Sequence, residues 1–261
     1  MRRLFVIFGI FFFLGCCFFA GNFLVEARKE APQKYRPVPA FVPAEEEVRP
    51  VSDSASSFIS ATERILIDAG LVNIKQLDSS IVVDLKYSGD DNFLFTDVYG
   101  DLNNAYLQKD VADKLRMAQR LLKARFPYYS LIVYDAVRPR SIQEKMWDSI
   151  DVPQAERSKY VSNPRNGSLH NYGAAVDLSI MDDNGIALDM GTPYDYFGEL
   201  AYPREEQRLV AEGKLTYKQL YNRQILREIM QQAGFSGITT EWWHFNSCSR
   251  DVAAAKYKIV E

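Results

Sequence analysis

The chain has 261 residues, of which 47% are hydrophobic and 25% are charged, with a net charge of −3. The length allows one domain of about 180–210 residues plus extra segments, or two small domains at most. The charge gives no reason to expect nucleic acid or an anionic membrane surface as a partner. Beyond Cys16 and Cys17 the only cysteine is Cys248, which excludes an internal disulfide in a processed chain and a zinc site built on cysteines.

Residues 1–27 have the pattern of a secretory signal. Arg2 and Arg3 precede an uncharged apolar run, and the small residues that end at Ala27 suit cleavage there. Two alternatives stay open. The run is long enough for a retained membrane anchor, and Cys16 lies in a sequence that loosely resembles a lipoprotein box, although the apolar residues after it argue against lipidation. All three interpretations predict an exported protein in the periplasm or cell envelope, two of them with a membrane tether.

Residues 28–56 are predicted to be a disordered linker. They contain five of the eleven prolines of the chain and show no apolar periodicity. Such a segment would hold a folded domain away from a membrane or envelope. The folded, catalytic domain is therefore expected to comprise residues 57–261.

Within this domain the apolar patterns predict short strands and longer amphipathic helices in irregular alternation. There is no repeated βαβ unit and no glycine-rich phosphate loop, which favours an α+β fold with helices on a small, mostly antiparallel sheet. We expect strands over 80–88, 130–136, 173–182 and 240–247, and helices over 109–126, 141–150 and 216–235.

Both histidines of the chain lie close to carboxylates in short, distinctive motifs. His170 and Asp177 belong to "SLHNYGAAVD", and His244 ends "EWWH". Two imidazoles and a carboxylate suit a zinc ion that keeps a fourth position open for water. Gly173 allows a tight turn, so that a loop histidine and a strand aspartate can meet at one ion. The sequence therefore predicts one zinc per chain, bound in a cleft on the sheet.

Glu241, three residues before His244, is the candidate general base. It would take a proton from the attacking water and pass it to the leaving amine. Residues three apart in a regular strand face opposite sides. Either the backbone bends or bulges here, or Glu241 belongs to the loop before the strand, and the sequence leaves both possibilities open.

Each motif alone also has a plainer interpretation. A lone histidine is usually a core or surface residue, and "EWWH" could be an edge strand with two packed tryptophans. The helical His-Glu-x-x-His signature of another metalloprotease class is absent. The zinc hypothesis depends on both motifs occurring together.

The two motifs fit Ser-x-His-x-x-Gly-x-Ala-x-Asp and Glu-x-Trp-His. Over about residues 70–250 the chain thereby resembles the zinc D-alanyl-D-alanine peptidases, specifically the VanX-type D-Ala-D-Ala dipeptidases. The resemblance implies an α+β fold in which His170, Asp177 and His244 bind zinc and Glu241 is the base.

Further positions carry the same resemblance. "YDAVRPRS" matches a segment whose arginine, here Arg138, would stabilise the oxyanion, although Arg138 could instead be a structural partner of Asp135. Ser168 matches a serine that binds the carboxylate of the substrate, with a role as a turn cap as the alternative. Asp195 in "MGTPYDYF" and Tyr87 in "LKYSGDDNF" match residues that hold the free ammonium, although Tyr87 is also plausible as plain core.

Taken together, these residues predict zinc-dependent hydrolysis of D-Ala-D-Ala to two D-alanines, in wall metabolism or scavenging. A glycopeptide-resistance role would require action on the cytoplasmic precursor pool, which export disfavours. One alternative is a zinc D,D-carboxypeptidase or wall endopeptidase that acts on longer peptides, for which the cleft would be open beyond Asp195. Another is a non-catalytic wall-binding module. No protein partner is predicted.

Overall fold

The computed structural model describes residues 59–261 of the chain. The predicted signal or anchor, residues 1–27, and the predicted linker, residues 28–56, lie outside the described residues. Within the described part, no helix has the length and apolar character needed to cross a membrane.

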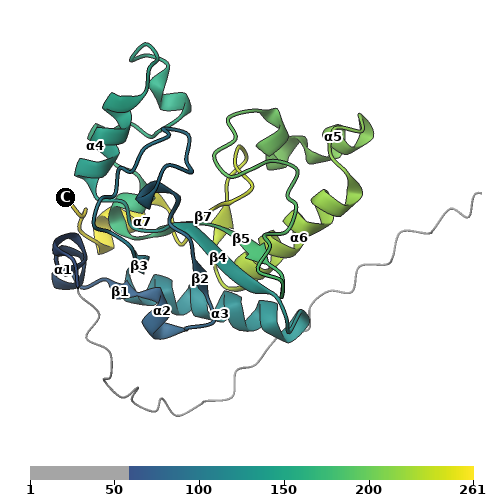
Figure 1. Ribbon diagram of the computed structural model, residues 1–261, viewed down its shortest axis with the longest axis horizontal. Helices are drawn as coiled ribbons and strands as arrows, with labels where there is room; N and C mark the ends of the chain where they lie inside the picture. Colours follow the sequence, from purple (N-terminus) through teal and green to yellow (C-terminus); the bar gives the residue numbers. More distant parts are fainter. Residues whose placement is uncertain (1–58) are drawn as a thin grey trace, which may run out of the picture. The chain divides into compact units, whose positions relative to one another are not determined.

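The described chain contains α-helices and short β-strands in irregular alternation (Figure 1). The helices are α1 (Ala61–Asp68), α2 (Ile74–Leu77), α3 (Lys109–Arg125), α4 (Arg140–Ser149), α5 (Glu206–Ala211), α6 (Tyr217–Gln232) and α7 (Arg250–Lys256). The strands are β1 (Val72–Asn73), β2 (Val82–Val83), β3 (Tyr106–Leu107), β4 (Ser130–Asp135), β5 (Ala175–Met181), β6 (Ser236–Gly237) and β7 (His244–Asn246).

Five of these strands form the central sheet in the order β2-β4-β5-β7-β6. Only β2 and β4 are parallel, and the other neighbours are antiparallel. A second sheet consists of β1 and β3, which pair antiparallel. The predicted α+β class with a mostly antiparallel sheet is therefore confirmed.

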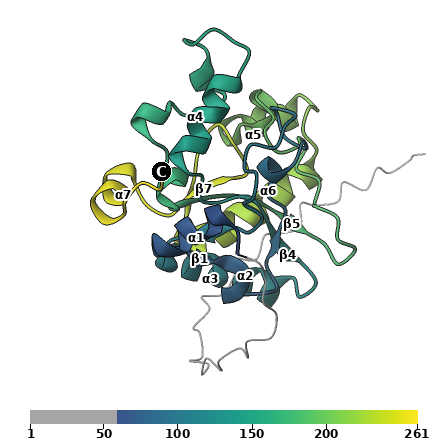
Figure 2. The same ribbon diagram turned by 60° about the vertical axis from the view of Figure 1, so that its left-hand side comes forward.

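Side-chain alternation gives the central sheet one apolar face and one face that carries polar groups. Val176, Leu178 and Phe245 belong to the main core, which α3 and α6 complete. Asp177 and His244 alternate with them and point to the opposite face, because successive residues of a strand face opposite sides. Figures 1 and 2 show α3 and α6 on one side of the sheet. The other face is left for the functional groups.

The longest predicted helices and the two central strands are confirmed almost to the residue. Thr216 is the N-cap of α6 and forms a capping box with Gln219. Gly234 follows the helix with a φ of 87°. The predicted strand over 80–88 is wrong beyond β2. The chain instead turns through a short 3-10 helix, η1 (Lys86–Ser88), which buries the Tyr87 ring. The sequence patterns do not predict helices α1, α2, α5 and α7.

A tight turn joins the two parts of "SLHNYGAAVD". His170 lies in the 3-10 helix η4 (Leu169–Tyr172), and Gly173 ends it in the left-handed region with a φ of 63°. A Cβ atom at Gly173 would lie 2.8 Å from Leu71 Cδ2. Both the backbone conformation and the close neighbour therefore require glycine.

We predict that Gly173→Ala lowers the free energy of unfolding by about 1–3 kcal/mol, because alanine is strained at this φ and its Cβ collides with Leu71. Gly185→Ala is the matched control: its φ is 78°, but a Cβ atom at this position would meet nothing within 4 Å. In urea denaturation, the free energy of unfolding of the control should fall only by the backbone cost of about 1–2 kcal/mol. Equal losses in the two variants would contradict the steric argument.

Candidate functional site

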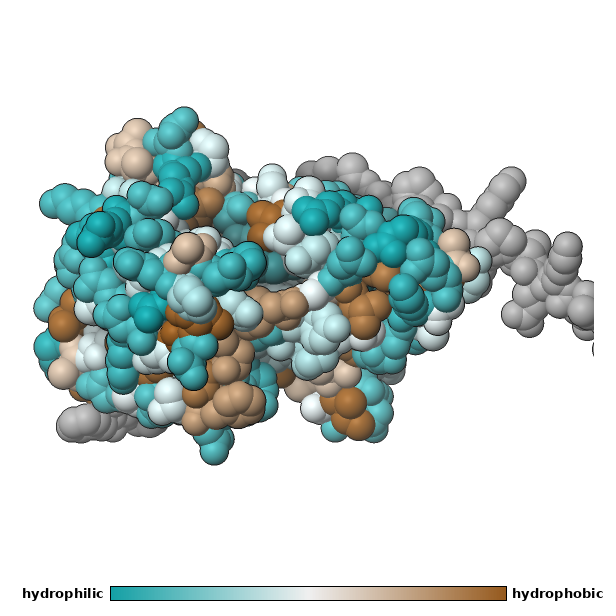
Figure 3. Space-filling view, turned by 90° about the horizontal axis from the view of Figure 1, so that it is seen from above, coloured by the Kyte–Doolittle hydropathy of each residue, from teal (hydrophilic) through white to brown (hydrophobic). Residues whose placement is uncertain are grey.

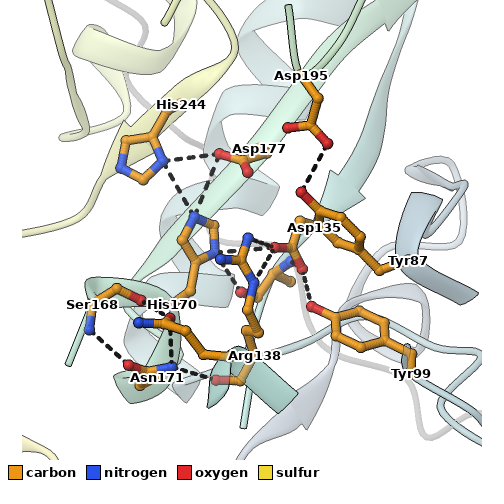
Figure 4. Close-up of polar contacts among 12 residues, drawn as sticks. Tyr87, Tyr99, Asp135, Arg138, Ser168, His170, Asn171, Asp177, Asp195 and His244 are labelled. Carbon is orange, nitrogen blue, oxygen red and sulfur yellow. Dashed lines mark hydrogen bonds and ion pairs between the residues drawn. The ribbon is translucent and has the colours of Figure 1, made fainter. Parts of the chain in front are cut away.

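His170, Asp177 and His244 meet on the polar face of the sheet (Figure 4). Asp177 and His244 are direct cross-strand partners in the β5–β7 pairing, and η4 brings His170 to them. Asp177 Oδ1 lies 2.9 Å from His244 Nδ1 and 3.4 Å from His170 Nε2. The two ring nitrogens are 3.2 Å apart. The three residues that the sequence singled out therefore form one cluster.

The outer nitrogen of each ring has a partner that fixes the orientation of the imidazole. His170 Nδ1 lies 2.7 Å from the carbonyl oxygen of Ala136, and His244 Nε2 lies 2.8 Å from Asn246 Oδ1. Both outer nitrogens must donate to these oxygens, which leaves His170 Nε2 and His244 Nδ1 with lone pairs directed at each other. Two lone pairs at this distance need a proton or a cation between them.

The same geometry shifts the pKa values of the cluster. Burial alone would raise the pKa of Asp177, but the two imidazoles outweigh burial and hold it far below its ordinary value. Burial likewise disfavours the charged form of His244, yet the hydrogen bond to Asp177 raises its pKa to about 9. Without a metal ion, His244 thus carries a proton, which an entering cation would displace.

The spacing of the donors fits a zinc ion. Zinc lies about 2.0–2.2 Å from nitrogen and oxygen ligands, so that neighbouring ligands of a tetrahedral site are about 3.3–3.6 Å apart. The observed separations of 2.9, 3.2 and 3.4 Å are close to this edge length. Two imidazoles and one carboxylate also make up a donor set typical of zinc sites that leave a position for water.

Glu241 lies beside this cluster, with its Oε2 atom 4.0 Å from His244 Nδ1. It belongs to the loop before β7, which begins only at His244. Of the two possibilities that the sequence left open, the structure therefore has the second: Glu241 lies in the loop and not in the strand. Burial raises the pKa of the Glu241 carboxyl, and the charge of His244 partly opposes this rise. A carboxylate with a raised pKa can both accept and return a proton.

Arg138 is held by a fully buried carboxylate. Asp135 ends β4, and a register shift after Val133 places it opposite Asp177. Asp135 accepts hydrogen bonds from Arg138 Nε at 3.1 Å, from the terminal nitrogen of Arg138 and from the Tyr99 hydroxyl. Burial opposes the charge of Arg138, but Asp135 raises the pKa of the guanidinium well above its ordinary value. The arginine is thus a fixed positive charge, and the ion pair with Asp135 orients it.

Tyr87 and Asp195 lie together on another side of the cluster. The Tyr87 hydroxyl donates to Asp195 Oδ2 at 2.8 Å. Asp195 has a φ of 59°, in the left-handed region that is unusual for a residue with a side chain. Burial raises the pKa of Asp195 well above its ordinary value, and no cationic side chain among the described residues pairs with it. This carboxylate therefore offers a place for a cation from outside the chain.

Ser168 is buried and donates its hydroxyl proton to Gln143 Oε1 at 2.8 Å. Its backbone N–H donates to Asn171 Oδ1 at 2.6 Å, which helps to begin η4. The alternative role of Ser168 in the local turn is thus present in the structure.

All eight residues that the sequence singled out line one cavity of about 420 Å³ on the polar face of the sheet. Viewed from above, the surface is hollowed and largely hydrophilic here (Figure 3). The eight are Tyr87, Arg138, Ser168, His170, Asp177, Asp195, Glu241 and His244.

Sequence reasoning missed two residues that orient the cluster of His170, Asp177 and His244. Asn246 accepts from His244, and a signal for it existed, because residues two apart in a strand share a face. Tyr194 donates its hydroxyl to Asp177 Oδ2 at 3.1 Å, on the oxygen that faces away from the histidines. The only sequence signal for a role of Tyr194 is that it directly precedes the candidate residue Asp195.

Comparison with known proteins identifies the family. Residues 67–259 match a peptidase family described as D-ala-D-ala dipeptidase. The chain belongs to this family, and it is an enzyme.

Relatives within the family are similar over most of their length. A D-alanyl-D-alanine dipeptidase of Escherichia coli is 32% identical over 175 residues, which span 67% of this chain and 83% of the relative. One from Enterococcus faecalis is 27% identical over 194 residues, or 69% and 92% of the two chains. The solved structure of the LdcB LD-carboxypeptidase shares 18% identity over 57% of this chain and 63% of that one, with a TM-score of 0.35. A score this low adds nothing to the family assignment.

We predict that Tyr194→Phe lowers the zinc affinity of this dipeptidase-family chain by about 10- to 100-fold, because the hydroxyl that orients Asp177 is lost. Competition with a zinc chelator measures the affinity directly. Tyr202→Phe serves as the control, since this tyrosine lies outside the cavity. Equal zinc affinities in Tyr194→Phe and the unmodified chain would contradict the role of the hydroxyl.

Proposed function

We propose that the protein is a zinc-dependent D-Ala-D-Ala dipeptidase, which hydrolyses the free dipeptide to two D-alanines. The family assignment and the names of the relatives support this substrate class. The observation that carries the proposal is the cavity itself. It combines three converging metal donors, an adjacent carboxylate and, on another side, an acidic group without a cationic partner.

One zinc ion per chain would be held by His170 Nε2, Asp177 Oδ1 and His244 Nδ1. When bound, zinc supplies Lewis acidity, which polarises the peptide carbonyl and makes water acidic enough to attack at neutral pH. Ala136 and Asn246 keep the two imidazoles in the tautomers that such binding requires.

The proton and the developing charge are handled by two side chains. Glu241 takes a proton from the water while the water oxygen bonds to the carbonyl carbon of the peptide. When the C–N bond breaks, Glu241 returns this proton to the nitrogen of the leaving amine. Arg138, fixed by Asp135, faces the negative charge that grows on the former carbonyl oxygen. Because both groups are in place before the reaction, little reorganisation is needed.

Asp195 and Tyr87 would bind the free ammonium of the dipeptide. A partly buried carboxylate that has no cationic partner among residues 59–261 gains most from a ligand that supplies one. This feature disfavours the alternative of a D,D-carboxypeptidase or wall endopeptidase, whose substrates carry an uncharged amide at this position. The retained base disfavours a non-catalytic wall-binding module.

The N-terminal 27 residues support export to the periplasm or cell envelope, either through a cleaved signal or with a membrane tether. D-Ala-D-Ala released during wall turnover would then be the available substrate. We therefore propose a role in wall metabolism or D-alanine scavenging.

The ammonium requirement is tested with blocked and free substrates. We expect N-acetyl-D-Ala-D-Ala to be cleaved with a kcat/KM about 100-fold below that of D-Ala-D-Ala, because the buried charge pair with Asp195 is lost. In Asp195→Asn this difference should shrink to a few-fold, since the variant keeps the shape but not the charge. Equal cleavage of the two substrates by the unmodified enzyme would favour the carboxypeptidase alternative.

The base is tested separately. We expect Glu241→Gln to lower kcat by about 10²–10⁴-fold while the zinc content stays at that of the unmodified enzyme. Glu228→Gln, a substitution on α6 outside the cavity, controls for loss of a carboxylate in general. Full activity in Glu241→Gln would remove this residue from the mechanism, and loss of zinc together with activity would make it a structural residue.

A further inference from the structure

The substrate carboxylate requires a hydrogen-bond donor that Ser168 does not provide. A hydroxyl has one proton, and that of Ser168 goes to Gln143 Oε1. Gln143 Oε1 also accepts from Asn171 Nδ2, which in turn donates to the carbonyl of Arg138. This buried network fixes the direction of the Ser168 proton. An anionic group beside Ser168 would meet the lone pairs of the hydroxyl oxygen.

Three cationic side chains besides the histidines line the same cavity, and they differ in their partners. Arg138 is paired with Asp135, and Lys159 is paired with Glu156. Arg250 has no acidic partner among the described residues. Its one hydrogen bond runs from a terminal guanidinium nitrogen to the carbonyl oxygen of Asn166 at 3.2 Å. A guanidinium has five N–H groups, so most of its donors remain free for a ligand.

The position of Arg250 places its charge on the side of the cavity away from Asp195. Asn166, to which Arg250 is bonded, lies two residues before Ser168. Figure 4 shows Ser168 and Asp195 on opposite sides of the histidine cluster. The Arg250 guanidinium, beside the segment that leads to Ser168, and the Asp195 carboxylate are therefore inferred to lie on different sides of the metal-binding donors.

A second free donor lines the same cavity as Arg250. Asn246 shares the polar face of β7 with His244 and uses its Oδ1 atom to accept from that ring. This assignment turns the Nδ2 amide away from the ring, and Nδ2 has no hydrogen-bond partner in the described chain. Both Asn246 and Arg250 line the cavity.

We propose that Arg250, assisted by the Asn246 amide, binds the terminal α-carboxylate of the dipeptide. This inference rests on the proposed function and adds a subsite to it. A guanidinium binds a carboxylate through two parallel hydrogen bonds, which fix direction as well as position. With the ammonium at Asp195 and the carboxylate at Arg250, the two charged ends of the substrate set the peptide bond between them, at the metal-binding donors.

The test compares Arg250→Gln with the unmodified zinc-loaded enzyme on D-Ala-D-Ala and on D-Ala-D-alaninamide, which lacks the carboxylate. We expect the variant to raise KM for the free dipeptide by about 10- to 100-fold with kcat within about three-fold, because hydrogen bonds to a charged group are lost in binding. With the amide, variant and unmodified enzyme should have the same KM. Arg250→Lys should recover part of the loss, since it keeps the charge without the two-pronged geometry.

Lys159→Gln is the matched control, because it removes a cavity-lining cation that already has an acidic partner. Its KM should stay within about two-fold of the unmodified value. An unchanged KM in Arg250→Gln, or an equal rise for both substrates, overturns the carboxylate subsite and leaves the proposed function intact. If the unmodified enzyme cleaves neither substrate, the proposed function fails, and the subsite fails with it.

Discussion

The cross-strand pairing of Asp177 with His244 is the constraint on which the rest of the site depends. The register of β5 against β7 puts a carboxylate oxygen 2.9 Å from an imidazole nitrogen on the polar face of the sheet. A slip of one residue in either strand would turn its member of this pair towards the core formed with α3 and α6. Val176 and Phe245, the apolar neighbours of this pair on the same two strands, are packed in the core. Their burial therefore helps to set the register on which the site depends.

The remaining groups are placed relative to this pair by short, irregular segments. The Gly173 turn returns the chain so that His170 reaches Asp177 from η4. The register shift in β4 sets Asp135 opposite Asp177, where it orients Arg138. A rigid sheet with functional groups on the segments around it is a common arrangement in enzymes, because the sheet fixes distances while the loops vary the chemistry.

Much of this arrangement was predictable from the sequence. The amphipathic pattern of residues 109–126 and the apolar run of 130–136 gave α3 and β4 directly. The two motifs supplied five of the eight candidate residues, and three further matching segments supplied Arg138, Asp195 and Tyr87. All eight line one cavity. The strand predicted over 80–88 ended early because the chain turns to bury Tyr87, which is a tertiary effect that strand propensity does not contain.

Other features could not be predicted because they arise only from side-chain placement. Nothing in the sequence showed that Ser168 would donate to Gln143. Nor did it show that Lys159 would pair with Glu156 while Arg250 has no acidic partner in the part of the chain that the structure describes. The contact of Tyr194 with Asp177 likewise joins residues that are adjacent only in the folded chain. Short helices such as α1 and α7 have too few residues to show a clear period, so their existence depends on packing.

The central claim is that one zinc ion is bound by His170, Asp177 and His244. The zinc K-edge X-ray absorption spectrum of the purified enzyme with one equivalent of zinc tests it most directly. The account predicts nitrogen and oxygen ligands at about 2.0–2.1 Å, with the outer-shell scattering of two imidazoles and no sulfur. Cys248 lines the same cavity. A sulfur ligand at about 2.3 Å, or a spectrum without imidazole scattering, would contradict the account.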